Sequence, residues 1–130
     1  MITTSRTTKY TQAVQDFILA KGHATNAEIL THLHQTYPEL SATTVHRITS
    51  RLVERGVIAL APSATDGSAR FDANTQPHDH FACAHCTGLR DVKIDRKILH
   101  SLEDELGGCK ITGQLLVQGS CSRCVKGGEI

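Results

Sequence analysis

Two pairs of cysteines with the same spacing constrain this chain more than any other feature. Cys83 and Cys86 form one Cys-x-x-Cys pair, and Cys121 and Cys124 form a second one. Each pair offers two sulfurs a short distance apart, and four thiolates in this arrangement suit a closed, tetrahedral zinc site. Because protein ligands would fill all four positions, such a zinc ion would be structural. The alternative is thiol redox chemistry, although no thioredoxin-like β-α-β pattern surrounds either pair.

The cysteine content also indicates the compartment. The 130 residues include 5 Cys, an odd number, and a disulfide framework would leave one thiol unpaired. The first ten residues lack the apolar stretch of a signal peptide. The longest apolar run, Val57 to Pro62, is far shorter than the roughly 20 residues of a membrane span. We therefore expect a reduced, cytoplasmic protein without a membrane segment, in which the fifth cysteine, Cys109, is a small buried hydrophobe.

A polar, proline-ended stretch at residues 73–77 predicts a boundary between two domains. We expect the first domain over residues 1–73 and the second over residues 74–130. The length excludes a large multidomain enzyme. The net charge of +1, from 14 basic and 13 acidic residues, does not identify a polyanion-binding protein, so any such role requires a local basic face.

The first domain has the pattern of a winged helix-turn-helix. Apolar residues at helical spacing predict a first helix over residues 9–20 and a second that runs from a capping box to Pro38. A third helix begins after Ser41, which can cap it. Two apolar stretches, at residues 57–60 and 69–72, then predict a hairpin with a long loop. In a domain of this kind the third helix lies in the major groove of DNA.

The third predicted helix has a short, polar and basic outward face. A solvated helix surface is the alternative interpretation of these side chains, and helix-turn-helix modules also serve as protein interaction domains. The position of the face within a winged helix-turn-helix favours DNA. The candidate DNA contacts are Thr43, Thr44, His46, Arg47, Ser50 and Arg51.

The second domain has an α/β pattern around the cysteine pairs. Strands are predicted over residues 89–92 and 110–118, with a helix between them that Asp95 can cap. A domain of about 55 residues is marginal on its own, so we expect a metal, a partner chain or both to supplement its core. The apolar positions of the helix, which we expect to face inward, are Ile98, Leu99, Leu102 and Leu106.

A second group of metal-ligand residue types precedes the first cysteine pair. His78 and His80 form a His-x-His pair, which places both imidazoles on the same side of an extended stretch. Carboxylates at Asp72 and Asp91 complete a nitrogen and oxygen site that suits Fe(II), Mn(II) or Zn(II). The alternative is a solvent-exposed His-Asp-His sequence without a ligand role. Spacing alone does not add His23 to this group.

These motifs occur in a specific order, which is SATTVHRITSRL, RFD, PHDHFACAHC and CSRC. The combination resembles the ferric uptake regulator (Fur) family of metal-dependent repressors. The resemblance implies an α+β homodimer with winged-helix domains that bind double-stranded DNA at A/T-rich inverted repeats, and with C-terminal α/β dimerisation domains. It implies a structural zinc on Cys83, Cys86, Cys121 and Cys124. It also implies a regulatory metal between the domains on His23, Asp72, His78, His80 and Asp91.

Within the family, the ligand pattern is similar to that of the peroxide-sensing branch. Position 72 has neither the Cys common in zinc sensors nor the Glu frequent in iron sensors, but Asp72. The resemblance implies Fe(II) or Mn(II) as the regulatory ion, and His23 and His78 as the imidazoles that peroxide oxidises on the Fe(II) form. The alternative is an iron, manganese or zinc uptake regulator of the same family, without peroxide sensing and with Zn(II) as a further candidate ion.

Neither interpretation makes the chain an enzyme. A metal-dependent hydrolase needs an open coordination position and a general base, and the sequence contains no motif of the HExxH kind. One departure from the family pattern concerns DNA recognition. His46 stands where the family usually has Tyr, so we expect a different base preference.

Overall fold

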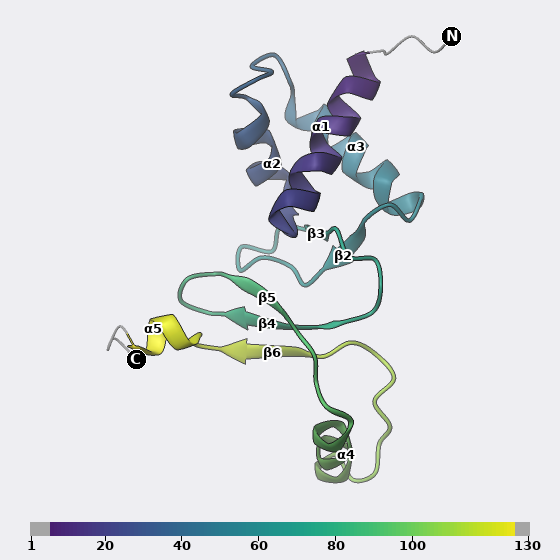
Figure 1. Cartoon of the computed structure of the whole chain (residues 1–130), viewed down its shortest axis with the longest axis vertical. Helices are drawn as coiled ribbons and strands as arrows, with labels where there is room; N and C mark the ends of the chain where they lie inside the picture. The colour runs from purple at the N-terminus through teal and green to yellow at the C-terminus, as the bar shows by residue number, and fades with distance from the viewer. Residues whose placement is uncertain (1–5, 127–130) are drawn as a thin grey trace. The chain divides into compact units, whose positions relative to one another are not determined.

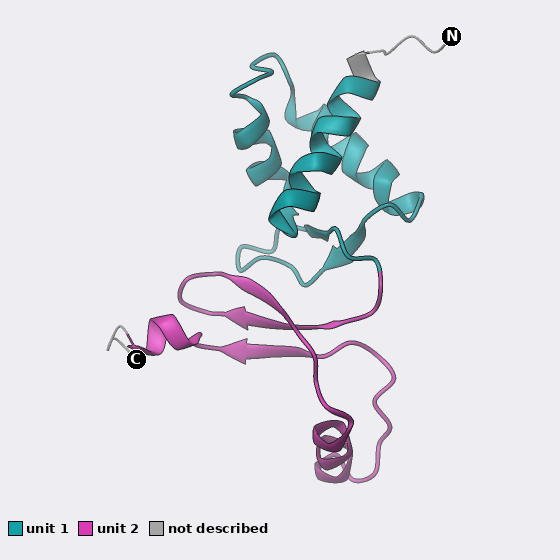
Figure 2. Cartoon of the chain, viewed as in Figure 1, with its two compact units in different colours: residues 1–75 teal, residues 76–130 magenta. Residues whose placement is uncertain are grey.

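The computed structural model describes residues 6–126, and the chain divides into two compact units. Unit 1 comprises residues 1–75 and unit 2 comprises residues 76–130 (Figure 2). The division falls two residues after the domain end expected at residue 73. Within the described part of the chain, no helix combines the length and the hydropathy that a membrane crossing requires.

Unit 1 contains the three predicted helices, which are α1 (Arg6–Lys21), α2 (Asn26–Leu33) and α3 (Ala42–Glu54) (Figure 1). The predicted end of α2 at Pro38 is wrong. The helix ends at Leu33 because the following turn folds back onto it, and the Tyr37 amide donates to the Leu33 carbonyl at 2.7 Å. The ring of His34 also holds the loop between α2 and α3, because its Nε2 lies 2.8 Å from the Leu40 carbonyl.

The wing of unit 1 has one more strand than the sequence predicts. The expected hairpin is present as β2 (Ala59–Ala61) and β3 (Arg70–Asp72), which pair in antiparallel fashion. A further strand, β1 (His23–Thr25), pairs with the other side of β3, so that the sheet has the order β1-β3-β2. This strand begins after Gly22, whose φ of 91° ends α1 and turns the chain into the sheet. Unit 1 is therefore a winged helix-turn-helix.

The core of unit 1 is aliphatic and continuous. Val14, Ile18, Ile29 and Val45 are fully buried and join all three helices. Phe71 of the wing closes the core from the sheet side. Thr49, in the middle of α3, is also fully buried, and it is the polar exception among these packed side chains.

Unit 2 is a small sheet with two helices. Its strands are β4 (Asp79–Cys83), β5 (Leu89–Val92) and β6 (Leu116–Gly119), in the order β5-β4-β6. Strand β5 pairs with β4 in antiparallel fashion, and β6 pairs with it in parallel. The strand predicted over residues 110–118 is wrong over residues 110–115. That segment is a loop anchored by side chains, because the Ile111 amide donates to Glu103 and the Leu115 amide donates to Asp79, each at 2.8 Å.

The helices of unit 2 are α4 (Arg96–Glu105) and α5 (Ser122–Lys126). Asp95 caps α4 as predicted, with its carboxylate 2.9 Å from the Lys97 amide. The expectation that the apolar face of α4 points into a core is wrong. Ile98, Leu102 and Leu106 are 53%, 39% and 57% exposed, and Leu99 is half-buried. Cys109, expected to be buried, is exposed as well.

The N-cap of α3 generates a stability prediction. The exposed Ser41 hydroxyl accepts from the Thr44 amide at 3.1 Å, so Ser41→Ala should lower the free energy of unfolding by about 1 kcal/mol. Ser41→Asp is the matched control, because a carboxylate can accept the same hydrogen bond. Urea unfolding of the three zinc-loaded proteins measures the difference. An Ala variant as stable as the Asp variant would show that the cap does not stabilise α3.

Candidate metal centres

The four cysteines of the two Cys-x-x-Cys pairs lie together in unit 2. Their sulfurs are all within 4.8 Å of one another. The Sγ atoms of Cys83 and Cys124 are 3.7 Å apart, and those of Cys86 and Cys121 are 3.8 Å apart. A zinc ion about 2.3 Å from each corner of a sulfur tetrahedron requires separations of about 3.8 Å. The cluster therefore has the dimensions of a tetrahedral thiolate site, and these separations are far too long for disulfide bonds.

Local structure brings the two cysteine pairs together. Cys83 is the last residue of β4, and the chain then turns through Thr87, which has a positive φ of 59°, before it returns as β5. Cys121 immediately precedes α5, so the first turn of this short helix presents Cys124 on the same side. The parallel pairing of β4 with β6 aligns the ends of both strands, with Cys83 opposite Gly119.

Backbone amides favour the thiolate form of two of the four cysteines, Cys83 and Cys121. The Sγ of Cys83 accepts from the amides of Cys86 at 3.4 Å, Cys121 at 3.3 Å and His85 at 3.4 Å. These donors lower the pKa of Cys83 to about 5, and the Cys124 amide is the main cause of a lowered pKa at Cys121. The neighbouring sulfurs of Cys121 and Cys83 raise the pKa of Cys124 to about 12. A divalent cation would remove this conflict, because it stabilises all four thiolates together.

Unit 1 carries two of the predicted nitrogen and oxygen ligands. His23 on β1 is directly opposite Asp72 on β3, and its Nε2 lies 3.3 Å from Asp72 Oδ2. The other carboxylate oxygen of Asp72 accepts from the Asn74 amide at 2.8 Å, which fixes the orientation of the group. Asp72 is 2% exposed, so the sheet holds a carboxylate and an imidazole in a largely buried position.

Unit 2 carries the other three. His78 immediately precedes β4, His80 lies on β4, and Asp91 lies opposite His80 on β5. Asp91 Oδ1 is 3.2 Å from Nε2 of His78 and 3.4 Å from Nε2 of His80. The two rings point to the same side, with centroids 4.4 Å apart, as the alternation of an extended chain predicts.

The partners of these side chains suit metal binding. Nδ1 of His78 lies 2.6 Å from the Gln76 carbonyl, so it carries the proton and leaves the Nε2 lone pair toward Asp91. Unit 2 offers two imidazoles and a carboxylate, and unit 1 offers an imidazole and a carboxylate, so the donors of each unit are nitrogen and oxygen atoms without thiolates. Such donors suit Fe(II), Mn(II) and Zn(II).

The predicted DNA-binding face of α3 is on the surface of unit 1. His46, Arg47, Ser50 and Arg51 are exposed, and so is Thr43. Thr44 is half-buried, because its amide and hydroxyl both contact the Ser41 cap. The helix therefore presents a polar and basic surface on the side away from the core.

Sequence reasoning missed two residues that link the elements of unit 1. Thr49 occupies a buried position of α3, and its hydroxyl lies 2.9 Å from the amide oxygen of Asn26, the first residue of α2. The available signal was the position of Thr49, four residues after Val45 and one after Ile48, within the apolar stripe of the helix.

Comparison with known proteins gives a consistent result. The sequence profile of the Ferric uptake regulator family matches residues 3–114. The chain is 31% identical to the peroxide-responsive repressor PerR of Staphylococcus saprophyticus over 87 residues, which cover 66% of this chain and 58% of that protein. It thus spans little more than half of that relative's length. It is 25% identical to the PerR of Staphylococcus epidermidis over 95% of this chain and 84% of that protein.

A solved structure shares the fold. The ferric uptake regulator Fur of Helicobacter pylori, whose structure is described as having three functional metal binding sites, matches with a TM-score of 0.71 and 21% identity. The match covers 90% of this chain and 80% of that one. The fold class expected from the sequence is confirmed, and so is the family resemblance. The chain belongs to the ferric uptake regulator family of metal-responsive repressors.

Proposed function

We propose that this chain is a DNA-binding transcriptional repressor that acts as a homodimer in the cytoplasm, binds Fe(II) or Mn(II) as its regulatory ion, and responds to peroxide through the Fe(II) form. The observation that carries the proposal is the presence of paired imidazole and carboxylate ligands on each side of residues 73–77. His23 and Asp72 are in unit 1, and His78, His80 and Asp91 are in unit 2.

One ion can be shared by the two ligand groups, because the chain itself keeps them close. Asp72 and His78 are six residues apart, so an extended chain separates them by at most about 20 Å. An ion held by both groups fixes the DNA-binding unit relative to the second unit. In a dimer, this fixes the spacing of the two α3 helices against an inverted repeat. A shift from mostly open to mostly closed requires that the ion favour the closed arrangement by about 5.5 kcal/mol.

The donor set and the exposure of the imidazoles support peroxide sensing. Fe(II), when bound, supplies the reducing equivalent for peroxide and directs oxidation to a ligand imidazole. The side chains of His23 and His78 are each 15% exposed, whereas that of His80 is 2% exposed. A small oxidant therefore reaches His23 and His78 more readily. The loss of one ligand would then release the ion and lift repression.

The α3 face and the wing support DNA binding. The exposed Arg47 and Arg51 are one helical turn apart, and either can reach a phosphate or a guanine edge from the major groove. The proposed target is an A/T-rich inverted repeat, whose two-fold symmetry would match that of a homodimer. The proposed contacts are those predicted from the sequence, which are Thr43, Thr44, His46, Arg47, Ser50 and Arg51.

The apolar surface of unit 2 supports the homodimer. Three leucine and isoleucine side chains of α4 are exposed, and Leu116 and Val117 of β6 are 42% and 44% exposed. A short unit with this much exposed aliphatic surface needs a partner to cover it. A second copy of the chain is the proposed partner.

A structural zinc supplies the interior that unit 2 otherwise lacks. Among the described residues of this unit, the buried side chains are Cys83, Cys121 and His80. Two of these three are thiolate ligands of the proposed zinc site, so the ion takes the place of a hydrophobic core. The proposed ligands are Cys83, Cys86, Cys121 and Cys124.

The zinc site predicts different outcomes for two cysteine substitutions. Cys124→Ser removes one thiolate, so the protein should lose its zinc and unfold at a temperature lower by more than about 10 °C. Cys109→Ser is the matched control, because Cys109 is an exposed cysteine outside the cluster. Metal analysis after dialysis against EDTA, with thermal unfolding, gives both readouts. Equal zinc retention in the two variants would contradict the assignment.

If α3 binds DNA, the loss of one positive charge should lower DNA affinity on this helix but not elsewhere. The probe is a DNA duplex selected from a random library by the Mn(II)-loaded protein. Arg47→Ala should weaken binding to this duplex about 10-fold to 100-fold. It should also reduce the slope of log affinity against log salt concentration by about 1, because one phosphate contact is lost. Lys110→Ala makes the same change in net charge at an exposed position of unit 2 and should leave affinity nearly unchanged. Fluorescence anisotropy at several salt concentrations measures both. Equal losses in the two variants would contradict a specific contact.

The peroxide hypothesis predicts where oxygen is added. Under anaerobic loading with Fe(II) followed by peroxide, mass spectrometry should find one added oxygen on His23 or His78, together with loss of DNA binding. The exposed His100 serves as an internal control and should remain unmodified, and Mn(II)-loaded protein should not be oxidised. If the Fe(II) form stays bound to DNA and neither histidine is modified, the chain is a metal uptake regulator rather than a peroxide sensor.

A further inference from the structure

We infer that the hydrogen bond between Thr49 and Asn26 is the contact through which an ion at His23 and Asp72 sets the position of the recognition helix α3. Thr49 and Asn26 are then positioning residues, since neither contacts the ion in the proposed site. This inference rests on the proposed function, because it concerns how the same metal response reaches DNA.

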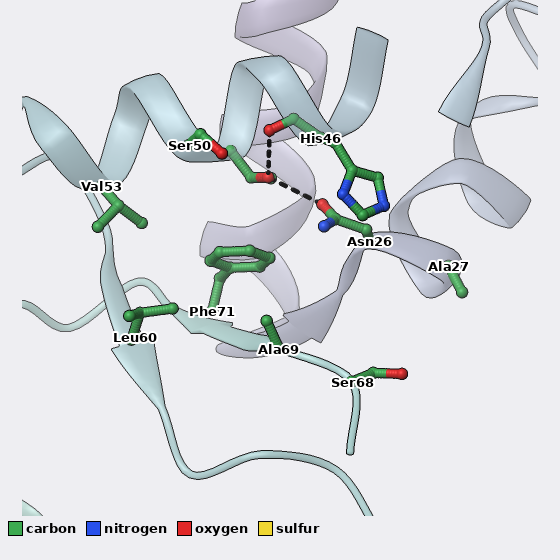
Figure 3. Close-up of a pocket in the computed structure, with 10 residues that line it drawn as sticks. Asn26, Ala27, His46, Ser50, Val53, Leu60, Ser68, Ala69 and Phe71 are labelled. Carbon is green, nitrogen blue, oxygen red and sulfur yellow. Dashed lines mark hydrogen bonds between the residues drawn. The ribbon is translucent and has the colours of Figure 1, made fainter. Parts of the chain in front are cut away.

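Thr49 connects α3 to α2 through a hydrogen bond of its side chain. Its side chain is fully buried, and its hydroxyl lies 2.9 Å from Asn26 Oδ1 and 3.2 Å from the carbonyls of Val45 and His46. Dashed lines in Figure 3 mark the contacts of this hydroxyl with Asn26 and with His46. A hydroxyl has one hydrogen to donate, and the amide oxygen of Asn26 is the nearest acceptor. The bond therefore connects the middle of α3 to the first residue of α2.

Asn26 is separated from the metal ligand His23 by a short and stiff segment. The segment is the rest of β1, which is paired with β3 residue by residue and holds His23 opposite Asp72. Its last residue, Thr25, is the N-cap of α2 and forms both hydrogen bonds of a capping box with Glu28, at 2.9 and 3.2 Å. An ion held by both His23 and Asp72 therefore also fixes the start of α2.

A cavity beside α3 makes this polar contact important. The space has a volume of about 490 Å³ and lies between α3 and the wing, with Phe71, Leu60 and Val53 on its apolar side (Figure 3). Closely packed neighbours resist the movement of a helix, and on the side of this open pocket α3 has fewer of them. His46 and Ser50 of the DNA-binding face also line this space, so movement of α3 here displaces candidate DNA contacts.

On its other side, α3 is held by aliphatic contacts. Val45, Ile48 and Leu52 are buried in the core that α1 and α2 share. Hydrophobic burial is non-directional, so it fixes the distance of α3 from its neighbours better than its rotation about its own axis. A hydrogen bond weakens steeply when its angle changes, and the Thr49 bond therefore specifies the rotation that directs the outward face.

The test compares how strongly Mn(II) improves DNA binding in four full-length proteins. For each, the coupling ratio is the DNA dissociation constant without Mn(II) divided by that with Mn(II), for a duplex selected from a random library by the wild-type Mn(II) form. Thr49→Val should lower this ratio about fivefold, because one hydrogen bond is lost from the metal-bound state. Thr49→Ser keeps the hydroxyl and should retain the wild-type ratio. Thr31→Val makes the same substitution at an exposed position of α2 and should also retain it.

A purely structural role for Thr49 gives a different result. In that case Thr49→Val weakens DNA binding by the same factor with and without Mn(II), the coupling ratio is unchanged, and the inference is overturned. Thr49→Val should fold, because valine fills the same volume and Asn26 is only half-buried and remains open to water. Zinc content and circular dichroism verify this.

Hydrogen–deuterium exchange separates failure of this inference from failure of the proposed function. In the wild type and in Thr49→Ser, Mn(II) should protect peptides from both β1 and α3. In Thr49→Val, protection should remain at β1 and be lost at α3. Equal protection of α3 in Thr49→Val and the wild type would overturn the inference alone. A wild type without Mn(II)-dependent protection at β1 would overturn the proposed regulatory site, and the inference with it.

Discussion

The pairing of β1 with β3 is the interaction on which the organisation of unit 1 depends. It places the imidazole of His23 opposite the carboxylate of Asp72, and it carries the chain directly into the N-cap of α2. A strand of only three residues thereby connects a proposed metal ligand to the start of a helix. Without the pairing, His23 would belong to a loop between two helices, where its position would vary and its affinity for an ion would fall.

Unit 2 differs from unit 1, because it is a short segment that forms a defined structure with little hydrophobic core. Its sheet buries few apolar side chains of its own, and its helix α4 leaves its aliphatic face exposed. The proposed zinc site in place of a core and the proposed second copy over the exposed face would be two separate sources of stability. The first acts within one chain, and the second depends on protein concentration. The two units thus differ in kind, since unit 1 has a continuous aliphatic core.

Local sequence signals predicted the parts of the structure that depend on neighbouring residues. The capping box at Thr25, the cap at Asp95 and the cysteine pairs all have their partners within a few positions along the chain. The sequence could not predict β1, because its three residues have no periodicity and pair with a strand nearly fifty positions away. It also could not show which side of α4 is covered, because an apolar helix face looks the same whether its own chain or a partner buries it.

The three amide donors around Cys83 have a consequence for how tightly the cysteine cluster can hold an ion. Two of them come from its own turn, and the third comes from Cys121, which lies 38 residues further along the chain. This last hydrogen bond joins two segments that are distant in the sequence, as the proposed zinc ion does. In a flexible peptide, the entropy of bringing such segments together opposes metal binding. Here the hydrogen bond and the proposed ion favour the same closed loop, so folding of unit 2 and zinc binding stabilise each other.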